Sequence, residues 1–436
     1  MSQEVSLFWF RRDLRLDDNV GLLEALKSNH QILPIFIFDK EILSKLPKND
    51  ARVSFIHTTL QRMRKQLQEE CESSIAMYHG SPIDTFKTII EDFNVKTVFT
   101  NRDYEPYAKN RDKKISDFLK ENEIEFKTFK DQVIFEKSEI VKSDGDPYVV
   151  YTPYKNKWQE QFNANTDLDI HYTSQYLSNL IKNTRLPNLS LSDIGFEKSK
   201  IEVPDYNVTP TLIDNYEDTR NFPAKDKGTS RLGPHLRFGT VSVRKMMKKA
   251  IAEQNKVFWS ELIWREFFMS ILYHYPKTVT NAFRAKYDRI EWRNNEKEFD
   301  KWKKGKTGYL LVDAGMRQLN ETGYMHNRVR MLVASFLCKH LLIDWRWGEA
   351  YFAEKLLDYE MSSNIGNWQW AAGSGVDAAP YFRIFNPMTQ VDKFDKDKKY
   401  IKEWIPEYGT EDYPEKMVDH KMARERCLET YKEAVS

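Results

Sequence analysis

The first 130 residues alternate short apolar runs with amphipathic segments, and this alternation limits the folds that the chain can adopt. The apolar runs have the length of β-strands, and the segments between them carry the 3.6-residue period of helices. Such alternation builds a mostly parallel sheet, so we expect an α/β doubly wound fold. The predicted strands are residues 5–10, 32–38, 74–78, 96–100 and 126–129, and the predicted helices are residues 19–30, 51–70, 82–93 and 107–123.

This region lacks the glycine patterns that bind nucleotide phosphates. Neither G-x-G-x-x-G nor G-x-x-x-x-G-K-[ST] occurs in residues 1–130. A nucleotide-like fold without its fingerprint must bind any ligand in another way. The later residues 373–378 match the loose form G-x-G-x-x-A, but they follow a helical pattern rather than a strand. We therefore interpret them as a turn of small residues.

From residue 210 onward the helical period dominates and strand-like runs are absent, which predicts an all-α second domain. Residues 131–205 lose the period and are rich in Pro, Ser, Asn and Asp. They indicate a long connector that runs over the surface, with a few helical turns near residues 153–162. The predicted organisation is an α/β domain at residues 1–130, an interdomain linker at 131–205 and a helical domain at 206–436.

Composition excludes several classes of protein. With 30% charged residues and a net charge of +2, any surface that binds a nucleic acid must be a local patch. The cysteines, Cys71, Cys338 and Cys427, fit no metal spacing and indicate a reducing compartment. The N-terminus shows no signal peptide, and the longest apolar run, near residues 331–343, is too short to cross a bilayer. We expect a soluble, cytoplasmic protein without a metal site.

Residues 356–387 hold the most unusual mixture of side chains in the chain. Two carboxylates and an amide offer hydrogen-bonding groups, and two tryptophans offer large flat rings. An ordinary core does not need this mixture, whereas a planar ligand with polar edges does. The residues concerned are Asp358, Glu360, Asn364, Trp368 and Trp370.

Residues 228–235 combine hydroxyl side chains with an arginine just before a helical pattern. Thr229 and Ser230 offer hydroxyls and exposed N–H groups, and Arg231 adds a positive charge, which together suit an anionic phosphate group. Taken alone, a plain helix cap beside a surface arginine is the simpler interpretation, because such caps are common.

Two further helical patterns carry charged and aromatic side chains. Glu261, Trp264 and Arg265 share one helix face, which suits a flat heterocycle or, equally, an Arg–Glu pair beside core aromatics. Arg328 and Arg330, near a predicted helix start, suit phosphate contacts or form a solvated charge run. Several isolated tryptophans also occur, but their spacing in the sequence does not show whether they are close in space.

Six long segments, taken together and in order, resemble the photolyase/cryptochrome family. They are WFRRDLRLDDN (9–19), GTSRLGPHLRFG (228–239), ELIWREFF (261–268), GKTGYLLVDAGMRQLNETGYMHNRVRM (305–331), LLIDWRWGEAYF (341–352) and residues 356–387. Six matches in register are spread over nearly the whole chain, and together they are far more specific than one short motif.

Within the family, the chain is most similar to DNA photolyases that repair cyclobutane pyrimidine dimers. Asn364 stands where those enzymes have an asparagine beside the flavin N5, and Asn327 departs from the paired histidines of (6-4) photolyases. The sequence also ends near the end of the flavin domain, without the long tail of signalling cryptochromes. The resemblance implies light-driven repair, in which excited, fully reduced FAD gives an electron to a dimer flipped out of the DNA.

Two alternatives belong to other functional classes. A cryptochrome-type blue-light photoreceptor would bind FAD and signal through a partner without repairing DNA. A flavin oxidoreductase would act on a small molecule in the dark, although no nicotinamide site is visible in the sequence.

The resemblance also implies a role for each site residue, a monomer, and DNA with pyrimidine dimers as the partner. Glu261 and Asn364 would act in catalysis, and Trp292, Trp345 and Trp368 would pass electrons to the flavin. The implied contacts to the dimer and the DNA are Glu261, Trp264, Asn327, Arg328, Met331, Trp370 and Arg383. The implied FAD contacts are Tyr216, Thr229, Ser230, Arg231, Leu232, Arg265, Asn327, Arg330, Asp358, Glu360 and Asn364.

The chain departs from the family pattern at a few of these positions. Glu360 replaces the more usual Asp, Phe258 and Tyr324 stand where Trp is common, and Gly233 stands where Ser is common. A second, antenna chromophore is also implied. Residues 103–107 (DYEPY) resemble members that bind a deazaflavin or a flavin more than members that bind a folate, and the identity of the chromophore stays open.

Overall fold

The structure is a computed structural model that describes residues 4–436, and it divides into two compact units. The sheet unit comprises the chain up to residue 136 with residues 161–205 and 232–249, and the helical unit comprises residues 137–160, 206–231 and 250–436. The predicted linker at residues 131–205 thus contributes to both units. The domain boundaries predicted at residues 130 and 206 stay a prediction.

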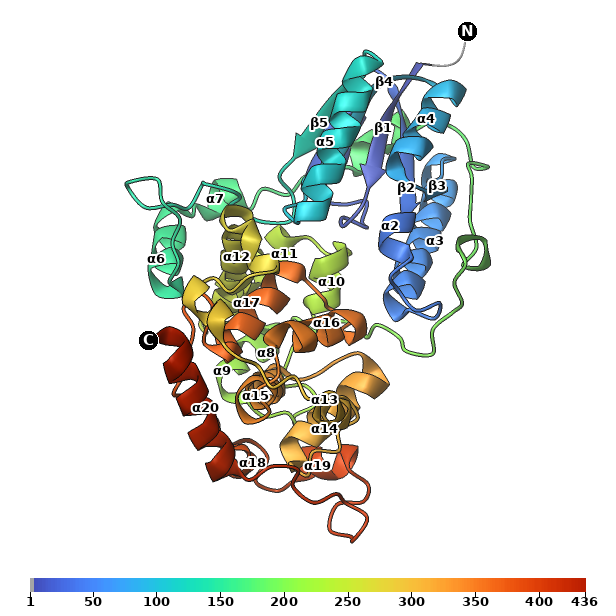
Figure 1. Cartoon of the computed structure of the whole chain (residues 1–436). Helices are drawn as coiled ribbons and strands as arrows, with labels where there is room; N and C mark the ends of the chain where they lie inside the picture. The colour runs from blue at the N-terminus through green and yellow to red at the C-terminus, as the bar shows by residue number, and fades with distance from the viewer. Residues whose placement is uncertain (1–3) are drawn as a thin grey trace. The chain divides into compact units, whose positions relative to one another are not determined.

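The sheet unit is built on a five-stranded parallel sheet of strand order β3-β2-β1-β4-β5, within the residues that the structure describes (Figure 1). The chain runs outward from β1 to one edge, then returns to the centre and runs to the other edge. This order confirms the predicted doubly wound fold. The strands are β1 (Glu4–Phe10), β2 (Gln31–Asp39), β3 (Ala76–Gly80), β4 (Asn94–Asn101) and β5 (Glu125–Phe129).

Alternate side chains of β1 enter two different hydrophobic cores. Leu7 and Trp9 pack with side chains of α4 and α5, whereas Phe8 and Phe10 pack with side chains of α1 and α3. Ser81 caps α4 as predicted, because its hydroxyl accepts from the N–H of Asp84. The helices of this part are α1 (Val20–Leu26), α2 (Lys40–Leu43), α3 (Ala51–Cys71), α4 (Pro82–Asp92) and α5 (Pro106–Glu121).

Two later segments complete the sheet unit. Leu177, Leu180 and Phe196 are buried in the core with α1 and α3, so this part of the connector does not simply run over the surface as predicted. Its apolar residues recur without a regular period, which is why the sequence pattern did not show their burial. The elements are α7 (Ala164–Asp167), η1 (Ser174–Asn179), η2 (Ser192–Ile194), α10 (Gly233–Phe238) and most of α11 (Val243–Ala252).

The helical unit consists of helices and loops over its described residues, as predicted, and its main core lies among α14, α15, α16 and α17. Its early elements are α6 (Tyr151–Gln161), α8 (Pro210–Asp214), α9 (Tyr216–Thr219), α12 (Val257–His274), η3 (Pro276–Val279), η4 (Ala285–Arg289) and α13 (Glu296–Lys303). The later ones are α14 (Leu310–Thr322), α15 (Asn327–Ser335), the π-helix η5 (Phe336–His340), α16 (Trp345–Lys355), α17 (Met361–Ala372), α18 (Pro387–Phe394), α19 (Lys399–Trp404) and α20 (His420–Val435).

The loose glycine fingerprint at residues 373–378 is a turn, as predicted. It follows α17 rather than a strand, and Gly373 ends that helix with a φ of 86°, a conformation that favours glycine. Among residues 4–436, no helix is both long and apolar enough to span a bilayer.

Candidate functional site

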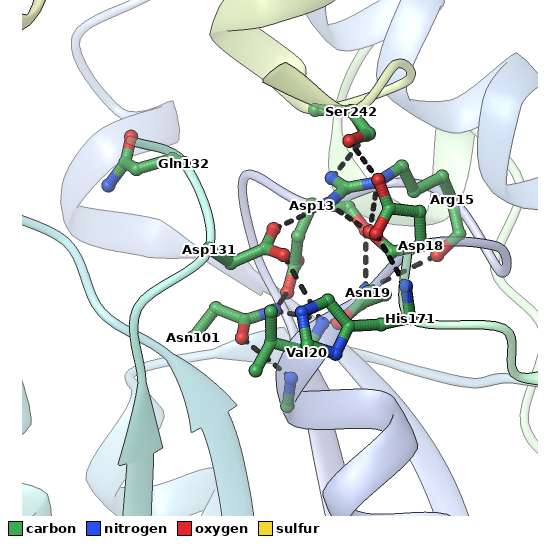
Figure 2. A network of polar contacts seen from close by, with 12 residues as sticks. Asp13, Arg15, Asp18, Asn19, Val20, Asn101, Asp131, Gln132, His171 and Ser242 are labelled. Carbon is green, nitrogen blue, oxygen red and sulfur yellow. Dashed lines mark hydrogen bonds and ion pairs between the residues drawn. The ribbon is translucent and has the colours of Figure 1, made fainter. Parts of the chain in front are cut away.

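The carboxyl ends of β1 and β4 are the expected ligand site of the sheet unit, because doubly wound sheets bind ligands where the strand order reverses. Here the protein's own side chains meet beyond these ends (Figure 2). Asn101, at the end of β4, donates from Nδ2 to Asp13 Oδ2 at 2.6 Å and to Asn19 Oδ1 at 2.8 Å. The polar groups at this edge therefore bond to one another.

The N-terminus of α1 lies at the same edge and is capped in the same way. Its first three N–H groups donate to Asp131 at 3.2 Å, Asn101 at 2.9 Å and Asn19 at 3.1 Å. These are the groups that bind phosphate in nucleotide-binding members of this fold class. Their occupation by side chains agrees with the absence of a glycine fingerprint.

Buried ion pairs extend the network toward α11. Arg244 donates to Asp18 Oδ1 and to Asp131 Oδ1, each at 2.9 Å, and Arg15 donates to Asp131 Oδ2 at 2.7 Å. Burial alone would raise the pKa of Asp131, but these two arginines lower it to about 2. Ser242 also donates to Asp18, so the network fastens the start of α11 to the sheet (Figure 2).

The predicted site residues of the helical unit lie on helices that pack together. α17 packs against α12, α15 and α16, which brings α12 together with three helices that lie much later in the sequence. Glu261, Trp264 and Arg265 lie on α12, and Asn327, Arg328, Arg330 and Met331 lie on α15. Asn364, Trp368 and Trp370 lie on α17, with Asp358 and Glu360 just before it.

Arg330 and Asp358 form a two-pronged ion pair. Arg330 Nη1 and Nη2 donate to the two carboxylate oxygens of Asp358 at 3.1 and 2.9 Å, and its Nε donates to the carbonyl of Met325 at 2.7 Å. Burial opposes the charge of the guanidinium, but Asp358 raises the pKa of Arg330 overall. The pair fixes the start of α15 to the segment before α17.

Asn364 is buried and held from one side. Its Nδ2 donates to Glu349 Oε1 at 2.9 Å and to the Glu349 carbonyl at 3.2 Å. The Oδ1 atom of Asn364 accepts no hydrogen bond from the residues that the structure describes, so it is an acceptor available to a ligand. Glu349, whose pKa is raised by burial, was not among the predicted residues.

Glu360, the departure from the family pattern, is the buried N-cap residue of α17. Its side chain makes no capping hydrogen bond to the helix, in contrast to the aspartate and asparagine caps of α1, α3 and α16. The Glu360 carboxylate therefore does not cap the first turn of α17.

Two partners of α12 were also absent from the predictions. Arg220 forms an ion pair with Glu261, and Tyr151 stacks on Trp264 with ring centroids 3.6 Å apart and planes 10° apart. Tyr151 comes from the segment 137–160, more than a hundred residues before α12, so no local pattern indicated it. Arg220 therefore restrains the Glu261 carboxylate, and Tyr151 restrains the Trp264 ring.

The segment around Thr229 does not form the plain helix cap that its composition suggested. α10 begins at Gly233 with Leu232 as its N-cap and no side-chain cap hydrogen bond. Thr229 Oγ1 lies 3.3 Å from the Tyr324 hydroxyl, and the Arg231 guanidinium lies over the Tyr324 ring, 3.5 Å from its centroid. Arg231 makes no ion pair with any described residue.

Arg328 is not part of a solvated charge run. Its Nη2 donates to Asn221 Oδ1 at 2.6 Å, and its guanidinium lies 4.4 Å from the centroid of the Phe394 ring. His326 is the N-cap of α15, where its Nδ1 accepts from the N–H of Arg328. Burial and the neighbouring arginines lower the pKa of His326 to about 3, so this histidine is neutral.

The tryptophans prove to share a core. Trp345 and Trp368 are each 2% exposed in the main core of the helical unit, and the partly buried Trp292 packs against that core. The ring of Trp368 also meets Trp302 edge to face at 6.2 Å. Trp370 is partly buried beside this core, whereas Arg383 is exposed and lies between α17 and α18.

Comparisons with known proteins agree with these observations. Residues 258–410 match the family described as FAD binding domain of DNA photolyase, and residues 6–171 match the family described as DNA photolyase. The chain is 35% identical to the deoxyribodipyrimidine photo-lyase of Halobacterium salinarum, over 99% of each chain.

Two solved structures have the same fold. A bacterial class III photolyase from Agrobacterium tumefaciens gives a TM-score of 0.88 at 33% identity, over 100% of this chain and 98% of that chain. An archaeal photolyase from Sulfolobus tokodaii, solved with two FAD molecules, gives a TM-score of 0.84 at 33% identity, over 99% of this chain and 100% of that chain.

Proposed function

The chain belongs to the photolyase/cryptochrome family, and on that premise we propose that it repairs cyclobutane pyrimidine dimers in DNA with the energy of light. The relative from Halobacterium salinarum, matched over nearly the whole chain, is named a deoxyribodipyrimidine photo-lyase, and we assign this chain the same activity, that of a carbon–carbon lyase. Reduced FAD, when bound and excited, supplies the electron for this reaction. On the chain's own residues, the observation that carries the proposal is the acceptor that Asn364 offers.

The helical unit has polar groups that fit a flavin. Asn364 offers its Oδ1 to a donor such as a ring N–H, and Arg231 is a cation without a carboxylate partner among residues 4–436, which suits a phosphate. We therefore assign FAD binding to the set that the family resemblance implied. It comprises Tyr216, Thr229, Ser230, Arg231, Leu232, Arg265, Asn327, Arg330, Asp358, Glu360 and Asn364.

Glu349 positions Asn364 in this proposal. Because both N–H bonds of the Asn364 amide face α16, the amide cannot turn without losing its hydrogen bond to Glu349. The Oδ1 atom therefore stays on the ligand side. Arg330 acts in the same way on Asp358, whose two oxygens it holds in one plane.

Glu261, Trp264, Asn327, Met331 and Trp370 would receive the flipped-out dimer. A flipped base needs aromatic stacking and polar contacts to its edges, and a dimer costs less to flip because its pairing is already weakened. Arg220 orients the Glu261 carboxylate, and Tyr151 supports the Trp264 ring. Both supports keep the lesion site in shape before DNA binds.

The two arginines proposed to touch DNA differ in exposure. Arg328 is partly buried and held by Asn221, while Arg383 is exposed. Burial lowers the pKa of Arg328, which agrees with a restrained side chain. We expect Arg383 to supply the larger share of phosphate contact, because an exposed guanidinium reaches the DNA backbone without rearrangement.

Trp368, Trp345 and Trp292 would carry electrons from the surface to the flavin. Their burial in one core supports the assignment, since the first two are almost inaccessible to solvent and the third lies at its edge. Gly348 permits α16 to lie against Trp368, because a Cβ at that position would come 2.1 Å from the ring. The core thus holds the Trp368 ring in one position.

We also propose an antenna chromophore, a deazaflavin or flavin rather than a folate. The support is the DYEPY segment and the Sulfolobus tokodaii photolyase, which was solved with two FAD molecules. In that segment, Tyr107 donates to Asp39 at 2.6 Å and Tyr104 donates to Glu136 at 2.6 Å. The protein would act as a monomer in the cytoplasm, where its three buried free thiols stay reduced.

A repair assay tests the proposed function. The purified protein, with its flavin reduced, is illuminated with blue or near-UV light in the presence of dimer-containing DNA, and restored thymines are measured. We expect repair in the light and none in the dark. Full flavin reduction without repair would favour the blue-light photoreceptor, and flavin turnover with a small molecule in the dark would favour the oxidoreductase.

A further inference from the structure

The segment at residues 378–385, called the strap below, connects α17 to α18 without regular secondary structure. It presents two side chains to solvent, since Phe382 is 59% exposed and Arg383 is also exposed. A segment without helix or strand hydrogen bonds needs other contacts to hold its shape. The strap therefore depends on what lies beneath it.

Apolar contacts hold the strap against α20. Tyr381 stacks on Tyr431 with ring centroids 5.9 Å apart and planes 16° apart, and Ile384 packs against the small core that contains Tyr431 and Cys427. Such contacts keep the strap on the surface of the helical unit. They are non-directional, so they do not determine how its backbone is oriented.

One side chain supplies the directional contact. Lys339 Nζ donates to the carbonyl of Arg383 at 2.9 Å. Among the residues that the structure describes, Lys339 is the only one whose side chain hydrogen-bonds the strap backbone. The bond reaches the same residue whose guanidinium faces solvent, so it fixes the point from which that side chain extends.

The location of Lys339 is costly for a structural residue. It is 1% exposed, and no described carboxylate pairs with it. Burial lowers the pKa of its amine to about 8, next to the thiols of Cys427 and Cys338. An apolar side chain would fill this core without the desolvation cost of an ammonium. Among the described residues, the hydrogen bond to the Arg383 carbonyl is the one hydrogen bond of the Lys339 amine that offsets that cost.

Lys339 also stands at a particular place in its helix. It lies in the π-helix η5, which continues α15 directly, and π-turns occur frequently at functional sites. α15 begins with Asn327 and carries Met331, both proposed to meet the dimer. One continuous helical run thus carries lesion contacts at its start and the support of the strap at its end.

We infer that Lys339 is a positioning residue for DNA binding, which holds the Arg383 carbonyl and thereby places the Arg383 guanidinium against the DNA backbone. The inference rests on the proposed function, because it takes Arg383 as a DNA contact. Lys339 itself does not touch DNA, since it is buried.

A double-mutant cycle tests this role. Lys339→Met, Arg383→Gln and the double variant are titrated in the dark with a fluorescent duplex that contains one thymine dimer. We expect Arg383→Gln to weaken binding about tenfold and Lys339→Met about fivefold, while the double variant binds no more weakly than Arg383→Gln. The FAD content of all three variants is expected to stay at the level of the unmodified protein.

Controls separate positioning from a loss of charge or of folding. Lys65→Met removes the same charge from a side chain that is 75% exposed in the sheet unit, and we expect it to leave the affinity unchanged. Lys339→Gln keeps an N–H donor without a charge, so its affinity is expected to lie between those of the unmodified protein and Lys339→Met. If Lys339→Met does not fold, Lys339→Gln takes its place in the double-mutant cycle.

The outcomes distinguish the inference from the function beneath it. Two results would overturn the positioning role while light-driven repair persists. In the first, Lys339→Met lowers the DNA affinity of the unmodified protein and of Arg383→Gln by the same factor. In the second, Arg383→Gln alone leaves the DNA affinity unchanged. Absence of repair in the unmodified protein overturns the proposed function instead. A Lys339→Gln variant as weak as Lys339→Met shows that charge rather than the hydrogen bond matters, and this also overturns the inference.

Discussion

The switch point of the sheet, where the strand order reverses at the ends of β1 and β4, and the site in the helical unit use the same residue types in opposite ways. At the switch point, Asp131 lies between two arginines, and Asn101 bonds to both Asp13 and Asn19. In the helical unit, Asn364 keeps an unbonded acceptor and Arg231 keeps an unpaired charge, as far as the described residues extend. An Asn or Arg side chain that leaves a group unsatisfied therefore favours a ligand site over a purely structural network.

Replacing Arg244 at the switch point is expected to have the largest effect, a loss of stability. Arg244→Met leaves the buried Asp18 carboxylate without a cation and Asp131 with Arg15 alone, which should lower the free energy of unfolding by about 3–5 kcal/mol. Urea unfolding measures this loss. A loss below about 1 kcal/mol would contradict the interpretation of the network as a structural lock.

Replacing Trp368 is expected to act mainly on function, beyond the stability that any smaller ring in this core would lose. Trp368→Phe should slow flavin photoreduction with an added reductant by about a hundredfold, a barrier change of about 2.7 kcal/mol, because phenylalanine is a much poorer electron donor. The measurement is the rate of flavin bleaching under blue light. Undiminished photoreduction would refute the assigned electron path, and Trp302→Phe, in the same core, is the matched control.

Replacing Arg231 should weaken cofactor binding with little effect on the fold. Arg231→Gln is expected to weaken FAD binding about tenfold, or about 1.4 kcal/mol, since a cation that faces a phosphate contributes to affinity directly. Titration of the apoprotein with FAD gives this value, and unfolding of the apoprotein gives the stability. Unchanged affinity with lowered stability would make Arg231 a structural residue like Arg244.

The smallest expected effect is a pH dependence that separates the two regions. The folded pKa of His326, about 3, lies below the usual value of 6.5, so the unfolded chain binds the extra proton first as the pH falls. Stability is therefore complete above about pH 6.5 and decreases toward pH 3, with about 0.7 kcal/mol lost from pH 7 to pH 6. Asp131, with a pKa of about 2, loses its contribution only below about pH 4.

Urea unfolding of His326→Asn at pH 7 and pH 6 measures the histidine contribution. Asparagine is also a good helix cap, so the variant should keep α15 and show a smaller difference between the two pH values. An identical difference in both proteins would mean that His326 does not titrate on unfolding as its burial indicates.

The fold was predictable where a local period records burial. β1 was expected at residues 5–10 and occupies Glu4–Phe10, because its side chains alternate between two cores. The end of the run that begins with α15 was harder to predict, since residues 325–345 have one apolar pattern, whereas η5 ends at His340 and α16 begins only at Trp345, capped by Asp344. A break of this kind depends on one side-chain hydrogen bond rather than on the pattern.

The supporting residues of the site were not predictable in the same way. Glu349 sits in an amphipathic pattern where a glutamate is ordinary, and its bond to Asn364 spans fifteen positions and two helices. Arg220 reaches Glu261 across forty-one positions. Such contacts follow from how helices pack, which a single sequence does not record.

Gly348 has a consequence beyond packing. Electron tunnelling falls exponentially with the gap between donor and acceptor, and the position of the Trp368 ring is set by the hydrogen atom that Gly348 carries in place of a methyl group. If Trp368 carries electrons to the flavin as proposed, Gly348 therefore sets one of the distances on which the transfer depends. Any larger residue at position 348 would then displace the Trp368 ring and change the rate of charge transfer, without replacing a residue of the proposed electron path.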